Sequence, residues 1–412
     1  MKSSSSNSFS RYQIFVIAIL AFLQFTIVLD FMVLSPLGAI LLSELSISTA
    51  EFGLVVSAYA FSAGASGLLS AGFADKFDRK RILLFFYTGF VAGTVLCALA
   101  PDYSFLLFAR IVTGLFGGVI GSISFAIVTD LFPLEKRGRV MGFVQMAFAL
   151  SQVLGIPVGL YLATKWNWHT PFQMIAAISV VVGLIIYLKL KAIDEHLKNP
   201  KEGNAWQHLK GILSNGFYLR GFAATTLLAT GGFMLMPFGS AYGVHNLGIP
   251  LTKLPLLYMI TGVCMLIFSP LIGTLSDKTG KFRMFVIGSI ITSIMTLIYC
   301  NLSETPFWII IILNVLLFVG ISGRMISASA LMTAVPSAQD RGGFMGINSS
   351  VQQISGGIAS LAAGMIVSES PEGKIEHYPT LGIVVVVAVV ATIWLMHIIH
   401  KRLLKHGLLE QG

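Results

Sequence analysis

Residues 273–283 read GTLSDKTGKFR, and residues 71–81 read AGFADKFDRKR. Each segment is short, polar and basic, and each separates two apolar runs that are long enough to cross a membrane. Aligning the two segments places Asp75 opposite Asp277, 202 positions further along the chain. The same kind of loop therefore occurs once in each half of the sequence, between a pair of apolar segments.

A second pair of loops repeats at nearly the same offset. PLEKRGRVMG begins at Pro133 and PSAQDRGGFMG begins at Pro336, which pairs Arg137 with Arg341. Two independent matches at nearly one offset indicate duplication of a six-helix unit. Parallel repeats of this kind are typical of transporters in which two bundles rock around a site near the membrane midplane.

The composition places the chain in a membrane. Of 412 residues, 55% are hydrophobic and 11% are charged, and the mean hydropathy is +0.84. Soluble domains carry about 25% charged residues, so a soluble enzyme is excluded. We expect an all-α polytopic membrane protein with twelve transmembrane helices in two six-helix bundles, residues 1–191 and 218–412, joined by a central cytoplasmic loop, 192–217. The twelve apolar windows are 13–42, 52–74, 82–100, 104–130, 140–163, 170–191, 218–244, 254–275, 284–302, 306–334, 343–367 and 379–400.

The distribution of basic residues predicts the orientation. Of 27 Lys and Arg residues, 22 lie in segments on the N-terminal side of the membrane, whereas the opposite segments hold Lys165, Lys253 and Lys374. Because cytoplasmic loops carry the excess of Lys and Arg, both termini are expected in the cytoplasm and the protein in the inner membrane. This asymmetry explains the net charge of +9 without a nucleic-acid partner.

The loop pattern resembles that of the major facilitator superfamily, G-x-x-x-D-R/K-x-G-R/K-R/K. The second copy matches it with Gly273, Asp277 and Gly280, whereas Ala71 and Asp78 replace both glycines in the first copy. The resemblance implies a latch that holds the cytoplasmic helix ends and biases the transport equilibrium. Its candidate residues are Asp75, Arg79, Lys80, Asp130, Arg137, Asp277, Lys281 and Arg341, with Asp130 expected to pair with Arg79 or Arg137.

Helix four resembles the drug:proton antiporter branch of that family. LLFARIVTGLFGG places Arg110 at the position that the branch links to proton transfer or substrate coupling. In helix five, SQVLGIPVGLY has Pro157 between Gly155 and Gly159, which is similar to the antiporter motif although the glycines are out of register. The resemblance implies export driven by the proton gradient, with no cofactor.

Asp30 is the clearest acidic residue within a predicted span, and such residues are costly and informative. Counted from Gln13 at the inner face, Asp30 lies roughly 25 Å along the first helix at 1.5 Å per residue, and Arg110 lies roughly 9 Å below the outer face. The two depths nearly agree. We therefore expect Asp30 and Arg110 to face a common cavity, in a coupling role or as a static ion pair.

Other polar groups in the apolar segments are less specific. Arg324 in helix ten has no obvious acidic partner in the second half, so it is expected either to contact substrate or to serve a structural or gating role. Further candidates for the cavity wall, for which hydrogen bonding between helices is the alternative, are Tyr59, Gln145, Gln152, Tyr242 and Gln352.

These observations favour a secondary active transporter that exports a small drug-like or amphipathic molecule by proton-coupled alternating access, as a monomer. The alternatives are a facilitator or proton symporter for a sugar, an organic acid or a lipid, and a non-transporting membrane receptor on the same fold. The sequence holds no Walker motif, nucleophile–base constellation or metal-ligand spacing, and the three cysteines lie in apolar runs. Neither an enzyme nor a metal site is therefore expected.

Overall fold

The computed structural model describes residues 9–70, 76–194, 197, 205–337 and 339–405. Within these residues, ten helices are long and apolar enough to cross a membrane. The two remaining predicted spans are helical as well. One is interrupted, which follows from a proline, and the other is less apolar, which follows from its packing. The expected all-α, twelve-helix fold is confirmed.

The first half of the molecule contains six spans. The first span is bent after α1 and continues as α2, and the fifth consists of three consecutive segments. The elements are α1 (Arg11–Val33), α2 (Gly38–Glu44), α3 (Thr49–Ser70), α4 (Arg79–Ala98), α5 (Tyr103–Leu131), α6 (Leu134–Leu150), the π-helical turn η2 (Ser151–Gly155), α7 (Ile156–Lys165) and α8 (Thr170–Lys189).

The second half repeats this arrangement after a short helix, α10, in the central segment. A small hairpin of two strands connects its last two spans. The elements are α10 (Ala205–Ser214), α11 (Gly216–Phe233), η3 (Met236–Phe238), α12 (Gly239–His245), η4 (Leu251–Lys253), α13 (Leu254–Thr279), α14 (Lys281–Cys300), α15 (Phe307–Met332), α16 (Arg341–Ile366), β1 (Ser368–Glu369), β2 (Ile375–Glu376) and α17 (Tyr378–Lys405).

The fifth span is interrupted because Pro157 has no backbone N–H to donate four residues back. The π-helical turn Ser151–Gly155 precedes this proline, and its wider hydrogen-bond spacing accommodates the residue that cannot donate. The eleventh span, α16, contains many Gly, Ser and Gln residues because it packs tightly on α3 along much of its length. Small residues let two helix backbones approach closely within a membrane.

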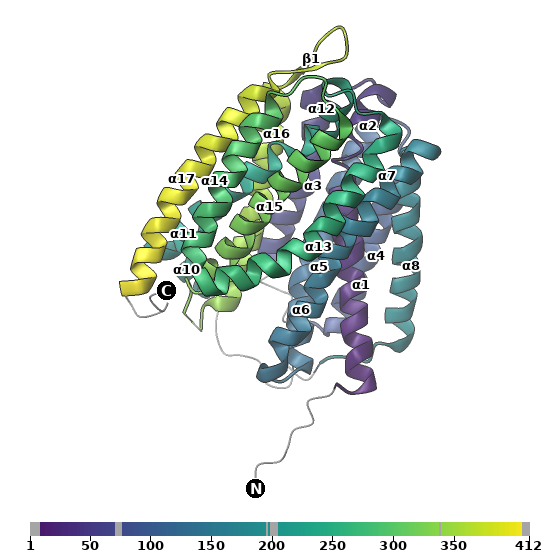
Figure 1. Ribbon diagram of the computed structural model, residues 1–412. Helices are drawn as coiled ribbons and strands as arrows, with labels where there is room; N and C mark the ends of the chain where they lie inside the picture. The colour runs from purple at the N-terminus through teal and green to yellow at the C-terminus, as the bar shows by residue number, and fades with distance from the viewer. Residues whose placement is uncertain (1–8, 71–75, 195–196, 198–204, 338, 406–412) are drawn as a thin grey trace.

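The hydrophobic core divides the molecule into a shared end and two separate ends. Helix α1 begins and α17 finishes at one end, called here the termini end, whereas β1, α2 and α12 lie at the opposite end, called the hairpin end (Figure 1). One core cluster at the hairpin end joins residues from both halves, including Phe52 and Phe238. At the termini end, the buried members of one cluster span 16–193 and those of another span 209–403. Among the described residues, the buried members of the two halves therefore join in one cluster at the hairpin end and form two clusters at the termini end, where Leu68 of the first half packs against the second.

Polar contacts also close the hairpin end. Thr49 Oγ1 of α3 donates to the carbonyl oxygens of Gly364 and Val367 at 3.2 and 2.7 Å. Ser240 Oγ of α12 donates to Ser35 O at 3.1 Å. At Gly53 on α3, a Cβ atom would lie 2.9 Å from Ser360 O of α16. The two halves are thus closed against each other at this end by hydrogen bonds and close backbone packing.

Helix α10 packs on the second half at the termini end. Leu209 and Ile212 are buried in the core cluster of that half, and Asn215 caps the following helix by accepting from the backbone N–H of Phe217. Part of the expected central loop, 192–217, is therefore a helix whose apolar side chains pack against the bundle.

Candidate functional site

The first half encloses an ion pair between Asp30 of α1 and Arg110 of α5. Arg110 Nη1 donates to Asp30 Oδ2 at 2.7 Å and to the backbone oxygen of Asp30 at 3.2 Å. Both side chains are 0% exposed. The contact predicted from the helix depths is present, so counting residues from each membrane face placed the two groups at the same level.

Two further helices complete this cluster. Thr94 of α4 donates from Oγ1 to Asp30 Oδ1 at 3.1 Å. The Arg110 guanidinium carbon lies 4.6 Å from the centre of the Tyr59 ring of α3, a cation–π contact. Arg110 Nε and Nη2 have no hydrogen-bond partner among the described residues. The pair is sealed inside the first half, so the expected contact is present but the common cavity is not seen around it.

An aromatic chain connects the ion pair to the second half. Phe31 follows Asp30, and its ring centre lies 5.1 Å from that of Tyr59. Phe31 also lies 5.8 Å, between ring centres, from Phe233 of α11. A movement of one half relative to the other would therefore be transmitted to the ion pair through the Phe233–Phe31 and Phe31–Tyr59 ring contacts.

The helix-five glycines bring that span close to α1. A Cβ atom at Gly155 would lie 2.6 Å from Leu29 Cδ1, and one at Gly159 would lie 2.9 Å from Val33 Cγ2. Gln152, in the π-helical turn, donates from Nε2 to Met32 Sδ at 3.2 Å. The Gly155–Pro157–Gly159 pattern thus positions the stretch of α1 that carries Asp30.

Arg324 lies on α15 in the second half and is 2% exposed. Its Nε and Nη2 atoms are buried and have no hydrogen-bond partner in the described part of the chain. A Cβ atom at Gly231 of α11 would lie 2.9 Å from Arg324 Nη1. The absence of an acidic partner that the sequence indicated holds for the residues that the structure describes.

The first-half latch residues form one predicted contact. Arg79 Nε donates to Asp130 Oδ2 at 2.9 Å, which is one of the two pairings expected for Asp130. Arg137 instead donates to the backbone oxygens of Phe132 and Thr129. Lys80 donates from Nζ to the Tyr187 carbonyl at 3.0 Å. Asp75 lies outside the described residues.

The two loop copies begin the following helix differently. Asp78 Oδ1 accepts from the backbone N–H groups of Lys80 and Arg81 at 2.7 and 3.4 Å, so it is the N-cap of α4. At the aligned position, Gly280 adopts φ +94° before α14. The missing glycine of the first copy is therefore replaced by a capping carboxylate.

The second-half latch residues form no matching cluster. Asp277 and Arg341 are exposed and Lys281 is half-buried. No ion pair is found for any of the three within the described residues. Within the described residues, the sequence repeat of the loops is therefore not matched by a repeat of the Arg79–Asp130 ion pair.

Sequence reasoning missed a polar cluster around Asp340 at the termini end. Tyr218 and Ser337 donate to Asp340 Oδ2 at 2.7 and 2.9 Å, and His208 Nε2 lies 3.0 Å from Oδ1. These contacts favour the charged carboxylate, with the Tyr218 hydroxyl contributing most, and they hold the pKa of Asp340 below its ordinary value of 3.8. The Ser–x–x–Asp spacing that precedes α16 was the available signal.

The remaining candidates for the cavity wall lie in different places. Tyr59 contacts the ion pair, as described above. Tyr242 is 3% exposed at the hairpin end, donates to the Leu302 carbonyl at 2.8 Å and stacks on Tyr378, so it packs loops together there. Gln352 is half-buried on α16. The side chain of Gln145 lies outside the described residues.

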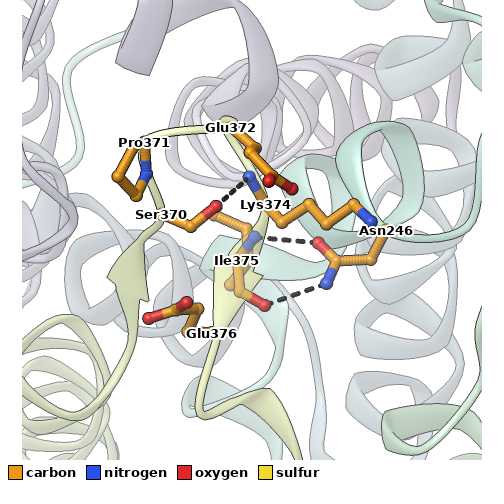
Figure 2. Close-up of a pocket in the computed structure, with 7 residues that line it drawn as sticks. All are labelled: Asn246, Ser370, Pro371, Glu372, Lys374, Ile375 and Glu376. Atoms are coloured by element: carbon orange, nitrogen blue, oxygen red, sulfur yellow. Dashed lines mark hydrogen bonds between the residues drawn. The ribbon is translucent and has the colours of Figure 1, made fainter.

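A pocket of about 360 Å³ lies beside the hairpin of β1 and β2 (Figure 2). One lining residue, Asn246, directly follows α12. Its side chain accepts from Ile375 N and donates to Ile375 O, both at 2.9 Å. Asn246 thereby fastens the hairpin to the end of α12. These contacts account for the polar lining without a ligand.

Two helical bundles share a core at one end, and a buried ion pair lies among the helices of the first bundle. These features together define a multi-pass membrane transporter. The sequence profile of the Major Facilitator Superfamily matches residues 20–360 and 221–407. The chain therefore belongs to this superfamily, as its loop motifs indicated, and it is not an enzyme. The family implies a small-molecule substrate and embedding in a lipid bilayer.

Curated relatives have names associated with export. Multidrug resistance protein 3 of Bacillus subtilis (strain 168) is 32% identical over 157 residues, which are 38% of this chain and 30% of that protein. A probable sugar efflux transporter of Helicobacter pylori (strain G27) is 27% identical over 183 residues, which are 44% of this chain and 46% of that protein.

A solved structure has the same fold. The inward-facing, occupied form of a bacterial homologue of the human lysosomal transporter Spinster superposes with a TM-score of 0.75. The two chains are 16% identical, and the match covers 97% of this chain and 99% of the other. This similarity supports the two-bundle architecture.

Proposed function

We propose that this transporter exports a drug-like or other amphipathic compound across the inner membrane in exchange for protons. Its termini end faces the cytoplasm in this proposal, because the basic loops lie there. The names of the two relatives support export, and the separate cores at the termini end support a state open toward the cytoplasm.

The observation that carries proton coupling is the sealed Asp30–Arg110 pair. Burial favours the neutral, protonated form of a carboxyl group, whereas an adjacent guanidinium favours the charged form. Because Phe31 contacts Phe233 of the other half, movement of the two halves can loosen the pair in one state and tighten it in another. Asp30 would take up a proton when the pair loosens and release it when the pair re-forms.

The test is proton movement in proteoliposomes that contain a trapped pH-sensitive dye. We would compare the wild type, Asp30→Asn and the control Asp102→Asn against a panel of cationic, neutral and anionic amphipathic compounds. Asp102 caps α5 from an exposed position, and Asn is an equally good capping residue. We expect substrate-driven proton movement in the wild type and in Asp102→Asn, and none in Asp30→Asn. Unchanged coupling in a folded Asp30→Asn variant would remove Asp30 as the proton carrier.

A facilitator or proton symporter for a sugar, an organic acid or a lipid is the second candidate, favoured by the relationship to a probable sugar efflux transporter. A facilitator would move such a compound down its gradient without any proton signal. A symporter would give proton movement in the same direction as the substrate.

A non-transporting receptor is the remote alternative and can be tested at the hairpin end. The backbone N–H of Ala39 donates to Ser240 Oγ at 3.4 Å across the two halves. A disulfide between Ala39→Cys and Ser240→Cys should stop flux by a transporter and leave binding intact. A receptor would retain its full function with the two halves cross-linked.

A further inference from the structure

Arg324 is the most unusual polar group that the proton-coupling mechanism does not use. A guanidinium carries five N–H donors in a rigid planar fork and stays charged under all ordinary conditions. Here Nε and Nη2 are buried with no acceptor among the described residues. Buried charges are normally paired with an opposite charge, because an uncompensated one is costly. The second half therefore contains a charged fork whose counter-ion is absent from the described chain.

Glycines hold this fork in place. A Cβ atom at Gly288 of α14 would lie 2.7 Å from the Arg324 backbone nitrogen, and one at Gly320 would lie 2.8 Å from the Thr292 nitrogen. Helices α14 and α15 thus pack backbone to backbone beside Arg324, which fixes where its side chain begins. At the other end, Nη1 lies so close to Gly231 of α11 that a Cβ atom there would be only 2.9 Å away.

The first half has an arginine between the corresponding pair of spans, at a different depth. Arg110 extends from the fourth span to the first, seven residues after α5 begins, whereas Arg324 extends from the tenth span to the seventh, seventeen residues after α15 begins. Asp30 of the first span faces Arg110, whereas Gly231 of α11 faces Arg324. Among the described residues, the arginine of the second half therefore lacks the carboxylate that the arginine of the first half has.

Arg324 lies near the interface between the halves. Phe233, two residues after Gly231, packs on Phe31 of the first half. Arg324 thus lies behind the stretch of α11 that faces the other bundle. A molecule held between the bundles would have Asp30 and Arg110 behind Phe31 on one side and Arg324 behind α11 on the other.

We propose that Arg324 is the subsite for an anionic group of the substrate, so the transported molecule is an amphipathic acid. Its carboxylate, sulfonate or phosphate group accepts hydrogen bonds from Nε and Nη2, the pair of donors that matches two oxygens of such a group. Its apolar part lies against the aromatic side chains between the halves. This inference rests on the proposed transport function and specifies the substrate class.

The experiment measures equilibrium binding, so it does not depend on proton coupling. Purified protein in a neutral detergent is titrated with matched acid and amide pairs, namely indole-3-acetate against indole-3-acetamide and salicylate against salicylamide, and the unfolding temperature is recorded. A ligand that binds the folded state raises that temperature by mass action. We expect the acids to stabilise the wild type and their amides to have at least about tenfold weaker effects in apparent affinity.

Three variants locate the effect. Arg324→Gln should lose the preference for acids, and Arg324→Lys, which keeps the charge but not the fork, should retain part of it. Asp30→Asn should keep acid binding while losing proton movement, so failure of the coupling proposal and failure of the anion proposal give different results. Adding phosphatidylglycerol to phosphatidylcholine nanodiscs tests an anionic lipid headgroup as the source of the same chemistry.

Some results would overturn the proposal. Acid binding that is equal in the wild type and Arg324→Gln would place the anion elsewhere. Equal effects of acids and amides, or no effect of any acid or of phosphatidylglycerol on the wild type, would show that Arg324 serves structure alone. Stabilisation by phosphatidylglycerol only, lost in Arg324→Gln, would retain the anion site and assign it to lipid, contradicting the amphipathic-acid substrate.

Discussion

Each half of the molecule places an arginine between corresponding spans, but at a different depth and in different surroundings. Arg110 has Asp30 at 2.7 Å, and Thr94 bonds to the same carboxylate, whereas Arg324 has buried N–H groups without a partner in the described chain and a glycine opposite. The duplicated helices were kept, whereas the charged groups between them are not equivalent. In this interpretation, one half binds protons and the other binds the substrate's charge.

Removing Arg110 gives the largest expected effect. Arg110→Met leaves the buried Asp30 carboxylate uncompensated, which should lower the free energy of unfolding by about 3–5 kcal/mol. The double variant Asp30→Leu/Arg110→Met should recover most of this loss, because apolar replacement of a buried pair is often neutral. Thermal unfolding in detergent measures both variants.

The double variant also separates stability from function. It should fold and yet show no proton movement. If the double variant were as unstable as Arg110→Met alone, the pair would be required for the fold and the comparison between the halves would lose its functional meaning.

Supplying the missing carboxylate should make the second half resemble the first. Gly231→Asp places an acid beside Arg324 Nη1 and should raise the free energy of unfolding by roughly 1–3 kcal/mol, because it satisfies a buried charged donor. It should also abolish stabilisation by acids. Gly231→Asn is the control with a similar shape and no charge. Retained acid binding in Gly231→Asp would show that anions do not bind at Arg324.

The two loops should differ in their response to alanine. Gly280→Ala forces φ +94° on a residue with a Cβ atom and should cost about 1–3 kcal/mol. Asp78→Ala removes the N-cap of α4 and should cost about 1 kcal/mol. Chemical unfolding of the two variants in parallel tests this order, and equal costs would mean that the loop conformations are not what distinguishes the copies.

The smallest expected effect is the pH dependence of α10 docking. Because the folded state lowers the pKa of Asp340, its contribution to stability is present above the ordinary value of 3.8 and is lost as the pH falls through the lower folded value. The protection of α10 amides from hydrogen exchange, relative to the intrinsic exchange rate at each pH, should therefore fall at acidic pH, and Asp340→Asn should remove this pH dependence. Pronounced pH dependence that persists in Asp340→Asn would assign it to another group.

The fold and the contact between Asp30 and Arg110 could be predicted from the sequence, because both depend on quantities that can be counted along the amino-acid sequence. The length of apolar runs predicted the spans, and a fixed rise per residue placed Asp30 level with Arg110. The direction in which a side chain points around its helix is not available in this way. Tyr242 was a candidate for the cavity wall with a hydrogen bond between segments as the alternative, and the structure shows the alternative, because Tyr242 donates to the Leu302 carbonyl at the hairpin end. The Asp340 cluster was missed because two of its partners, His208 and Tyr218, are distant in sequence.

Arg110 contacts the backbone oxygen of Asp30 as well as its carboxylate. A peptide carbonyl does not titrate, so this second hydrogen bond remains available when the carboxyl group is neutral. Under the proposed mechanism, protonation changes the net charge of the cluster while the guanidinium keeps an anchor on α1. Charging and discharging the cluster then requires little movement of the arginine, and the cost of reorganising a buried site at each transport cycle stays small.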